Sequence, residues 1–168
     1  GPGDDGWAVV LQINLGNLSI TMQTPFEFDS QDCKAPALAK IDNSHYLCAY
    51  GGKDSDGWVV VLDVTGASGT VSKYTPFEYD TVNGETPSLI WIKDYDYLCA
   101  YNGNGDKGNI AALRVAADTW DVSTAAFCQF DAKAKVPALM RIDDLYCICA
   151  YQGPGDDGWT GVLRYGAP

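Results

Sequence analysis

The sequence predicts an all-β protein built from repeats of one antiparallel unit. Short apolar, aromatic or β-branched runs alternate with turn-forming residues, and no segment shows a helical period. A second observation is internal repetition, because the same phrases return at steps of 51, 51 and 50 residues. The third is the content of each repeat, since four such runs fit within one period. We therefore expect units of four antiparallel strands.

Equivalent residues mark the repeat along the whole chain. One position, directly after a turn glycine, is occupied by Trp7, Trp58, Asn109 and Trp159. The phrase YLCAY at 46–50 returns at 97–101 and, as CICAY, at 147–151. Residues 153–168 are a second copy of residues 1–16. We expect a single repeat domain over 1–168, with units at 1–51, 52–102 and 103–152 and a partial fourth copy at 153–168.

Residues 36–80 contain one unit in full. Its strands are expected at 36–42, 45–52, 58–64 and 71–80. The first ends in the turn-prone DNS, and the second is aromatic and ends on two glycines. The turn before the third strand contains Asp56-Gly57, a dipeptide favoured in tight hairpins. The fourth strand holds Pro76, which indicates an edge or a bulge.

The same strand order extends to both ends of the chain. The chain begins with the third and fourth strands of a unit at 7–15 and 18–28, and two whole units follow at 36–80 and 87–131. It ends with the first three strands of another unit at 137–165. The expected total is 13 strands.

The stretch PALAKIDNSHYLCAYGG…DGWVVVLDV resembles the first three strands of a blade in propellers of the sialidase-like and lectin kind. The resemblance is one of repeat style, extends over nearly the whole chain and brings no catalytic motif. It implies a β-propeller with about three four-stranded blades per chain. A β-trefoil is the alternative, because it also has three units of four strands and closes within one chain. The duplicated strand favours the propeller, since a trefoil has no use for a thirteenth strand of the same type.

The charge of the chain limits its partners. The formal net charge is −11, and the sequence pI is about 4.2. Phosphate binding needs clustered Lys and Arg, so we expect no nucleic acid partner and no docking on anionic lipid. No apolar run approaches the length that spans a bilayer. We expect the protein to lie outside the cell or at its surface.

Aromatic and acidic residues at the repeated hairpins are the candidate ligand-binding residues. They are Trp7, Trp58 and Trp159, the neighbouring Asp5, Asp56 and Asp157, and Tyr50, Tyr101 and Tyr151 at the end of the preceding strand. An aromatic face beside a carboxylate suits a sugar, whose ring stacks on the aromatic while its hydroxyls bond to Asp. The alternative is packing between blades, which is favoured for the tyrosines and stays open for the tryptophans.

Other functional classes find little support in the sequence. The acidic turns suggest calcium, but they lack enough oxygen ligands, and the third copy has lost most of the pattern; a plain hairpin turn is the preferred interpretation. We expect no metal, no cofactor and no catalytic residues. His45 is the single histidine and is not part of a recognisable triad. Cys48, Cys99 and Cys149 recur on an apolar strand and are expected to be buried and reduced.

The expected function is that of a non-enzymatic propeller-type binding module. Its repeated Asp-Gly-Trp loops suit multivalent carbohydrate recognition, in which many weak sites act together. The alternative is a structural building block of an extracellular array or filament. The expected partner is a second copy of the chain, because three blades are too few to close a propeller. The copies would form either a homodimer that closes a ring or an open polymer.

Overall fold

A computed structural model describes residues 3–66 and 69–165. The protein is all-β, with 64% of its residues in strands. The described part of the chain contains no α-helix, and its helical turns are the three-residue η1 (Lys53–Ser55) and η2 (Pro154–Asp156). The predicted all-β class is confirmed.

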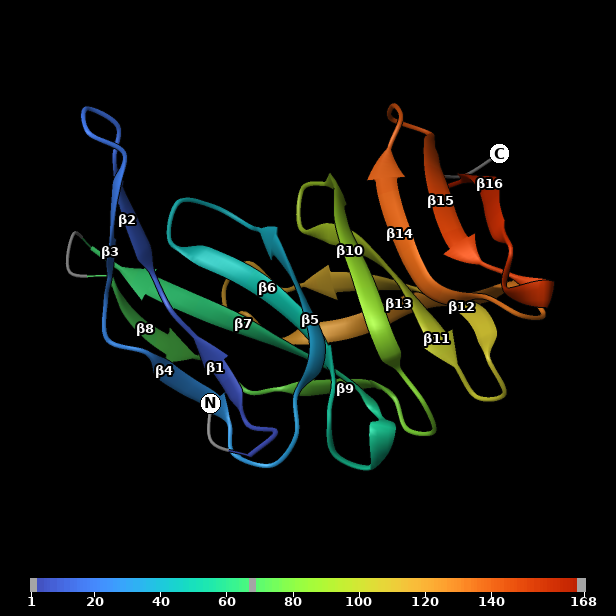
Figure 1. Cartoon of the computed structure of the whole chain (residues 1–168), viewed down its shortest axis with the longest axis horizontal. Coiled ribbons are helices and arrows are strands. Elements are labelled where there is room, and N and C mark those ends of the chain that lie inside the picture. The colour runs from blue at the N-terminus through green and yellow to red at the C-terminus, as the bar shows by residue number, and fades with distance from the viewer. Residues whose placement is uncertain (1–2, 67–68, 166–168) are drawn as a thin grey trace.

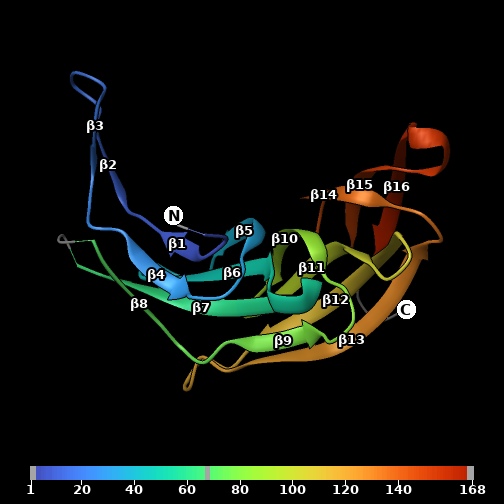
Figure 2. The same ribbon diagram turned by 60° about the horizontal axis from the view of Figure 1, so that its bottom comes forward.

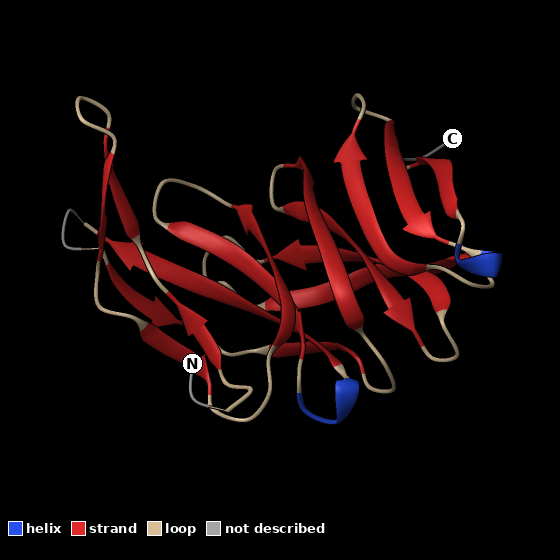
Figure 3. Ribbon diagram, in the orientation of Figure 1, coloured by secondary structure: helices blue, strands red, loops and turns tan. Residues whose placement is uncertain are grey.

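Three antiparallel sheets follow one another in chain order (Figures 1 and 3). Sheet 1 contains β5 (Lys34–Lys40), β6 (His45–Gly51), β7 (Gly57–Thr65), β8 (Thr70–Lys73) and β9 (Phe77–Asp80). Sheet 2 contains β10 (Glu85–Lys93), β11 (Asp96–Gly103), β12 (Lys107–Val115) and β13 (Val122–Asp131). Sheet 3 contains β14 (Lys135–Arg141), β15 (Tyr146–Gln152) and β16 (Gly158–Arg164). None of the sheets is closed.

An N-terminal segment precedes these sheets and forms two small antiparallel pairs. One pair joins β1 (Gly6–Ala8) to β4 (Phe26–Asp29), and the other joins β2 (Leu11–Asn14) to β3 (Ser19–Met22). The β2–β3 hairpin projects away from the remaining sheets (Figure 2). The N-terminal segment and sheet 3 lie at opposite ends of the molecule (Figure 1).

The predicted number of strands is wrong, because the described residues form 16 strands and not 13. Three expected strands are each divided in two: 7–15 into β1 and β2, 18–28 into β3 and β4, and 71–80 into β8 and β9. Pro25 and Pro76 lie at two of the breaks, where proline has no N–H to give to the ladder. Phe127 occupies the equivalent place in sheet 2, and there β13 runs without a break.

Apolar side chains pack between successive sheets. The largest cluster lies between sheets 1 and 2 and includes Leu47, Val61, Tyr97 and Leu113. A second cluster lies between sheets 2 and 3, and a third joins Phe28 of the N-terminal segment to sheet 1. Each strand therefore presents alternate residues to the sheet before it and to the sheet after it, which explains why the runs of β6, β7 and β11 are apolar without interruption.

The Asp-Gly dipeptides have a different role from the predicted one. Left-handed backbone angles occur earlier in the same turn, at Asp54 (φ 60°) and Ser55 (φ 68°), and not at Gly57. Gly57 is buried in β7 under the ring of Tyr79, where an added Cβ would lie 2.4 Å from a ring carbon. Glycine is needed at this position because a side chain would collide with the aromatic ring of the neighbouring strand.

The three repeated cysteines lie where the sequence predicts. Cys48, Cys99 and Cys149 are buried and free. Burial raises the pKa of Cys99 to about 12, so its thiol stays protonated at neutral pH. The expected burial is confirmed, and the reduced state stays a prediction.

Candidate binding site at the hairpin ends

The candidate aromatic residues face one another across the hairpins, as expected. Tyr50 is the register partner of Trp58 in β6 and β7, and Tyr151 is the partner of Trp159 in β15 and β16. In sheet 2 the same register pairs Tyr101 with Asn109. Directly opposed residues of an antiparallel pair project from the same face of the sheet. Each hairpin therefore carries its two candidate residues side by side.

The tyrosines connect neighbouring sheets through their hydroxyl groups. Tyr50 donates a hydrogen bond of 2.8 Å to Asp29, Tyr101 one of 2.8 Å to Asp80, and Tyr151 one of 2.6 Å to Asp131. Each accepting aspartate belongs to the last strand of the preceding unit. The tyrosine ring also packs edge-on against an aromatic ring of that strand, as Tyr101 does on Tyr79 with centroids 5.0 Å apart.

Burial is the larger cause, ahead of the aspartate hydrogen bond, of the raised pKa of Tyr50 and Tyr101. Both side chains are fully buried, whereas Tyr151 is partly exposed. A buried phenol with its hydroxyl already bonded has little to offer a ligand. The surroundings of Tyr50 and Tyr101 match the favoured alternative, in which the tyrosines pack between neighbouring sheets.

The tryptophans are more accessible than the tyrosines. Trp7 is 39% exposed and Trp159 is 48% exposed, while Trp58 is half-buried. The Trp58 and Trp159 rings lie over glycines of the preceding turn, since an added Cβ on Gly52 or Gly153 would come within 2.4 Å of the indole. The ring position is thus fixed by a repeated glycine. Nε1 of Trp58 is buried and has no hydrogen-bond partner among the described residues.

The fourth strand of each unit brings a second acidic side chain to the tryptophan. Glu78 of β9 is the register partner of Trp58, and Glu27 of β4 is the partner of Trp7. Glu78 also lies beside the predicted Asp56. Burial, the hydrogen-bonded carboxyl of Asp56 and the nearby charge of Asp80 raise the pKa of Glu78. The site in sheet 1 is therefore an indole with two adjacent carboxyl groups.

Sequence reasoning missed the two glutamates. They occupy the middle of the repeated phrases PFEFD and PFEYD, and the third copy, FCQFD, has Gln129 instead. The sequence does contain a signal for the glutamates: the unit with Gln129 is also the unit that has Asn109 in place of tryptophan and Lys107 in place of the aspartate. All three positions change together in one repeat.

Contacts that hold the units together persist where these three residues change. Phe130 covers Gly108 in sheet 2 just as Tyr79 covers Gly57 in sheet 1, with an added Cβ 2.5 Å from the ring. Tyr151 keeps its hydrogen bond to Asp131. The fold thus forms around Asn109 without the tryptophan and the carboxylates. We call Asp56, Trp58 and Glu78, and the equivalent Asp5, Trp7 and Glu27, the hairpin-end triads.

The structure places the triads on separate hairpins and does not bring the repeated tryptophans into one site. Trp7 lies in the N-terminal segment and Trp159 in sheet 3, at opposite ends of the molecule. Trp159 has Asp157 nearby in sequence but no fourth strand beside it, because β16 pairs with β15 alone among the described strands. Its triad therefore lacks a glutamate.

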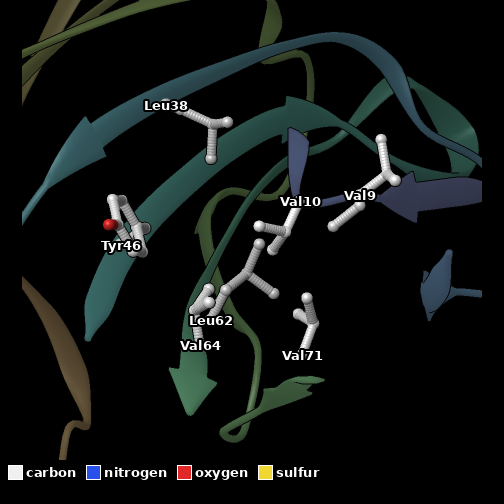
Figure 4. Close-up of a pocket in the computed structure, with 8 residues that line it drawn as sticks. Val9, Val10, Leu38, Tyr46, Leu62, Val64 and Val71 are labelled. Carbon is white, nitrogen blue, oxygen red and sulfur yellow. The ribbon is translucent and has the colours of Figure 1, made fainter. Parts of the chain in front are cut away.

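A separate apolar cavity of about 220 Å³ lies beside the N-terminal segment. Leu38 and Tyr46 of sheet 1 line one side of it, and Val9 and Val10 of the N-terminal segment line another (Figure 4). Leu62, Val64 and Val71 form its floor. It contains none of the predicted site residues.

Within residues 3–66 and 69–165, no three His, Cys, Asp or Glu side chains are placed to hold a metal ion. The described part of the chain also has no helix of the length and apolarity that crossing a membrane requires. No protein family model matches the chain, and no curated protein matches it. Function is therefore inferred from the residues and their geometry.

Proposed function

We propose that this chain is a non-enzymatic, propeller-type binding module that recognises carbohydrate through its hairpin-end triads. The single observation that supports this function is the joint replacement of Asp, Trp and Glu by Lys107, Asn109 and Gln129 in one unit, which still keeps the aromatic ring over its glycine and the tyrosine–aspartate hydrogen bond. The three residues change together while those two contacts stay, which is the pattern that a shared binding role of the three would produce.

The chemistry of the triad suits a sugar ring. The exposed face of an indole offers an apolar platform for the C–H face of a pyranose, and adjacent carboxylates accept hydrogen bonds from its hydroxyl groups. Asp56 and Glu78 supply up to four carboxyl oxygens next to Trp58. Asp80 is already used by Tyr101, so it contributes charge rather than a free acceptor.

The arrangement of sheets supports a propeller over a trefoil. Open antiparallel sheets of similar strand order follow each other and pack through apolar faces, with the same tyrosine–aspartate bond at each junction. A trefoil closes within one chain, and none of these sheets is closed. About three blades per chain, carrying weak sites on separate hairpins, suit multivalent binding to a surface rich in glycans. We also propose that the protein lies outside the cell or at its surface and binds neither nucleic acid nor membranes.

Binding to an immobilised glycan panel tests the proposal. Trp58→Ala and Glu78→Gln should each lower the bound fraction on any glycan that retains the parent protein. Asn109→Ala is the matched control, because it changes the equivalent position in the unit without a triad. The proposal fails if the parent protein binds no glycan, or if Trp58→Ala and Asn109→Ala bind equally well.

A structural building block is the second candidate function, favoured by the exposed apolar surface at both ends of the molecule. Electron microscopy of the purified chain separates the two. Filaments or sheets without glycan retention would support the structural role.

A further inference from the structure

Two exposed apolar surfaces lie at opposite ends of the row of sheets. The first, which we call the front surface, consists of the exposed Leu38 and the half-buried Tyr46, with the cavity beside them. The second, the end surface, is the outer side of sheet 3 and includes Met140, Ile142 and Val162. Each surface has a covered equivalent inside the molecule.

The front surface matches a buried surface of sheet 2. Leu38 is 63% exposed, whereas its equivalent Leu89 is 9% exposed and packs in the core between sheets 1 and 2. Tyr97, the equivalent of Tyr46, is fully buried and donates a hydrogen bond of 3.2 Å to the carbonyl oxygen of Lys40. Sheet 1 covers both residues of sheet 2. Within residues 3–66 and 69–165, no four-stranded sheet precedes sheet 1, and Leu38 lies beside the small β1–β4 segment.

The end surface matches the side of sheet 1 that provides this cover. Val162 is 63% exposed, and its equivalent Val61 is fully buried against sheet 2. Ile142 is 54% exposed, and its equivalent Ile92 is 8% exposed in the core between sheets 2 and 3. The two outer surfaces are therefore the two halves of an interface that the molecule already forms twice within itself.

Among the described strands, none pairs with the second edge of β16, so sheet 3 has three strands where sheet 2 has four. In the other units an aromatic ring covers a glycine: Phe28 covers Gly6, Tyr79 covers Gly57 and Phe130 covers Gly108, each within 2.6 Å of an added Cβ. No described atom lies within 4 Å of the same position on Gly158. Residues 153–159 repeat residues 1–7 letter for letter. The sequence before and around Gly158 is therefore the same as the sequence around Gly6, which Phe28 covers.

We infer that a second copy of the chain completes sheet 3, with its β4 pairing to β16 and its Phe28 covering Gly158. The register follows from β1 and β4: Trp159 would face Glu27 and Thr160 would face Phe26. Phe28 keeps its contact with Tyr50 of its own chain and exchanges Gly6 for Gly158. The end surface of one copy then covers the front surface of the other.

The exchange also gives a partner to the exposed strand β3. Leu11 and Ile20 are each more than half exposed, although their equivalents in sheet 1, Leu62 and Val71, are buried. In the complex, β3 and β4 both lie along β16 of the partner copy, which takes the place of the similar strand pair β1 and β2. An open strand edge of this kind is a ready site for pairing with another chain. Two such contacts between two copies close a pair, which is the commonest symmetry of homo-oligomers.

Substitutions at the two competing glycines test the inference in the full chain by light scattering over a concentration series. The parent protein should exceed its monomer mass of 18.1 kDa, reaching twice that value for a closed pair or more for an open chain. Gly158→Val should weaken association by about tenfold or more, because its side chain would meet the incoming Phe28. It leaves the isolated chain undisturbed, since the space around Gly158 is open.

Gly6→Val should act in the opposite direction. Its side chain would meet Phe28 of the same chain, release β1 and favour the exchange. Gly161→Ala is the control, because Gly161 is on the same strand, has open space and faces sheet 2, where the equivalent residue is Ala111. A parent protein that stays monomeric, or a Gly158→Val variant that associates as well as the parent, would overturn the inference.

A crosslinking experiment checks the register. Chains carrying Glu27→Cys are mixed with chains carrying Trp159→Cys under mild oxidation, and the linked peptides are identified by mass spectrometry. Both positions are exposed in the free chain. A disulfide between positions 27 and 159 supports the proposed pairing. Its absence from oligomers that do form would assign them to a different contact and would reject the strand exchange.

Discussion

The hydroxyl of Tyr101 donates a hydrogen bond of 2.8 Å to Oδ2 of Asp80, and this bond joins β11 of sheet 2 to β9 of sheet 1. The same relation links Tyr50 to Asp29. The tyrosine ends the phrase LCAY, and the aspartate ends the phrase that carries the triad glutamate. The two most regular parts of the repeat thus meet in space at the junction between units.

Removing this hydroxyl should weaken the fold. Tyr101→Phe leaves Asp80 without its buried donor, and we expect the free energy of unfolding to fall by about 1–3 kcal/mol. Urea unfolding followed by tryptophan fluorescence measures the change. Tyr151→Phe is the matched control and should cost less, because Tyr151 is partly exposed and water can replace its hydrogen bond. An equal loss for the two variants would contradict the role of burial.

A side chain at Gly57 should also be destabilising. Gly57→Ala would place a Cβ 2.4 Å from the Tyr79 ring, and relieving such an overlap typically costs about 1–3 kcal/mol. The equivalent Gly158→Ala has open space and should change the unfolding free energy of the monomer very little. If the glycine were needed for its turn angles, both variants would lose stability together. Thermal unfolding at low protein concentration distinguishes the two results.

Glu78→Gln should stabilise the protein while weakening ligand binding. Burial and the carboxyl groups of Asp56 and Asp80 raise the pKa of Glu78. A carboxyl group whose folded pKa exceeds its unfolded value loses its favourable contribution as pH rises through the folded pKa, so its charge opposes folding at neutral pH. Glutamine removes that charge, and we expect Tm to rise by about 1–3 °C. A fall in Tm would show that Glu78 has a structural role.

Alkaline pH should loosen the junctions between sheets. Burial, followed by the charge of Asp42, raises the pKa of Tyr97 to about 12, and the hydrogen bond to Asp131 followed by burial raises the pKa of Tyr151 to about 12. Because the folded pKa lies above the unfolded value, the stabilisation is complete below about pH 10 and is lost as pH rises through 12. Tyrosinate absorbance and urea unfolding across this range measure it. A Tyr97→Phe variant should show a shallower loss of stability.

Thiol labelling should separate the cysteines by burial. Cys128 is exposed, so we expect it to react first with a maleimide on the folded protein. Cys99 is fully buried, and its pKa is raised to about 12 by that burial, so it should stay unlabelled until the chain unfolds. Mass spectrometry of labelled peptides gives the order, with the urea-unfolded protein as the reference for full labelling. Early labelling of Cys99 would contradict the packing between sheets 1 and 2.

Much of the candidate site could be predicted from the sequence, and the missing part has a clear physical reason. The hairpin pairing of Tyr50 with Trp58 follows from strand order and turn length, which are local properties. Glu78 lies 20 positions beyond Trp58 in the chain, and its place beside the indole depends on how the fourth strand aligns with the third. A bulge between Gly57 and Trp58 shifts that alignment, and no local sequence pattern predicts the bulge.

The sequence by itself determined the all-β class, the repeat and the burial of Cys48 and Cys99. These follow from the alternation of turn residues with apolar runs, which is a local property of the chain. The tertiary structure decided what each repeated residue does. Tyr50 and Trp58 are both repeated aromatic residues in the sequence. Tyr50 is fully buried and donates a hydrogen bond to Asp29, whereas Trp58 lies beside the carboxyl group of Glu78 at a hairpin end. Both rings lie on the same face of sheet 1, and the difference arises because Phe28 and Asp29 of β4 cover Tyr50, a contact between residues far apart in the chain.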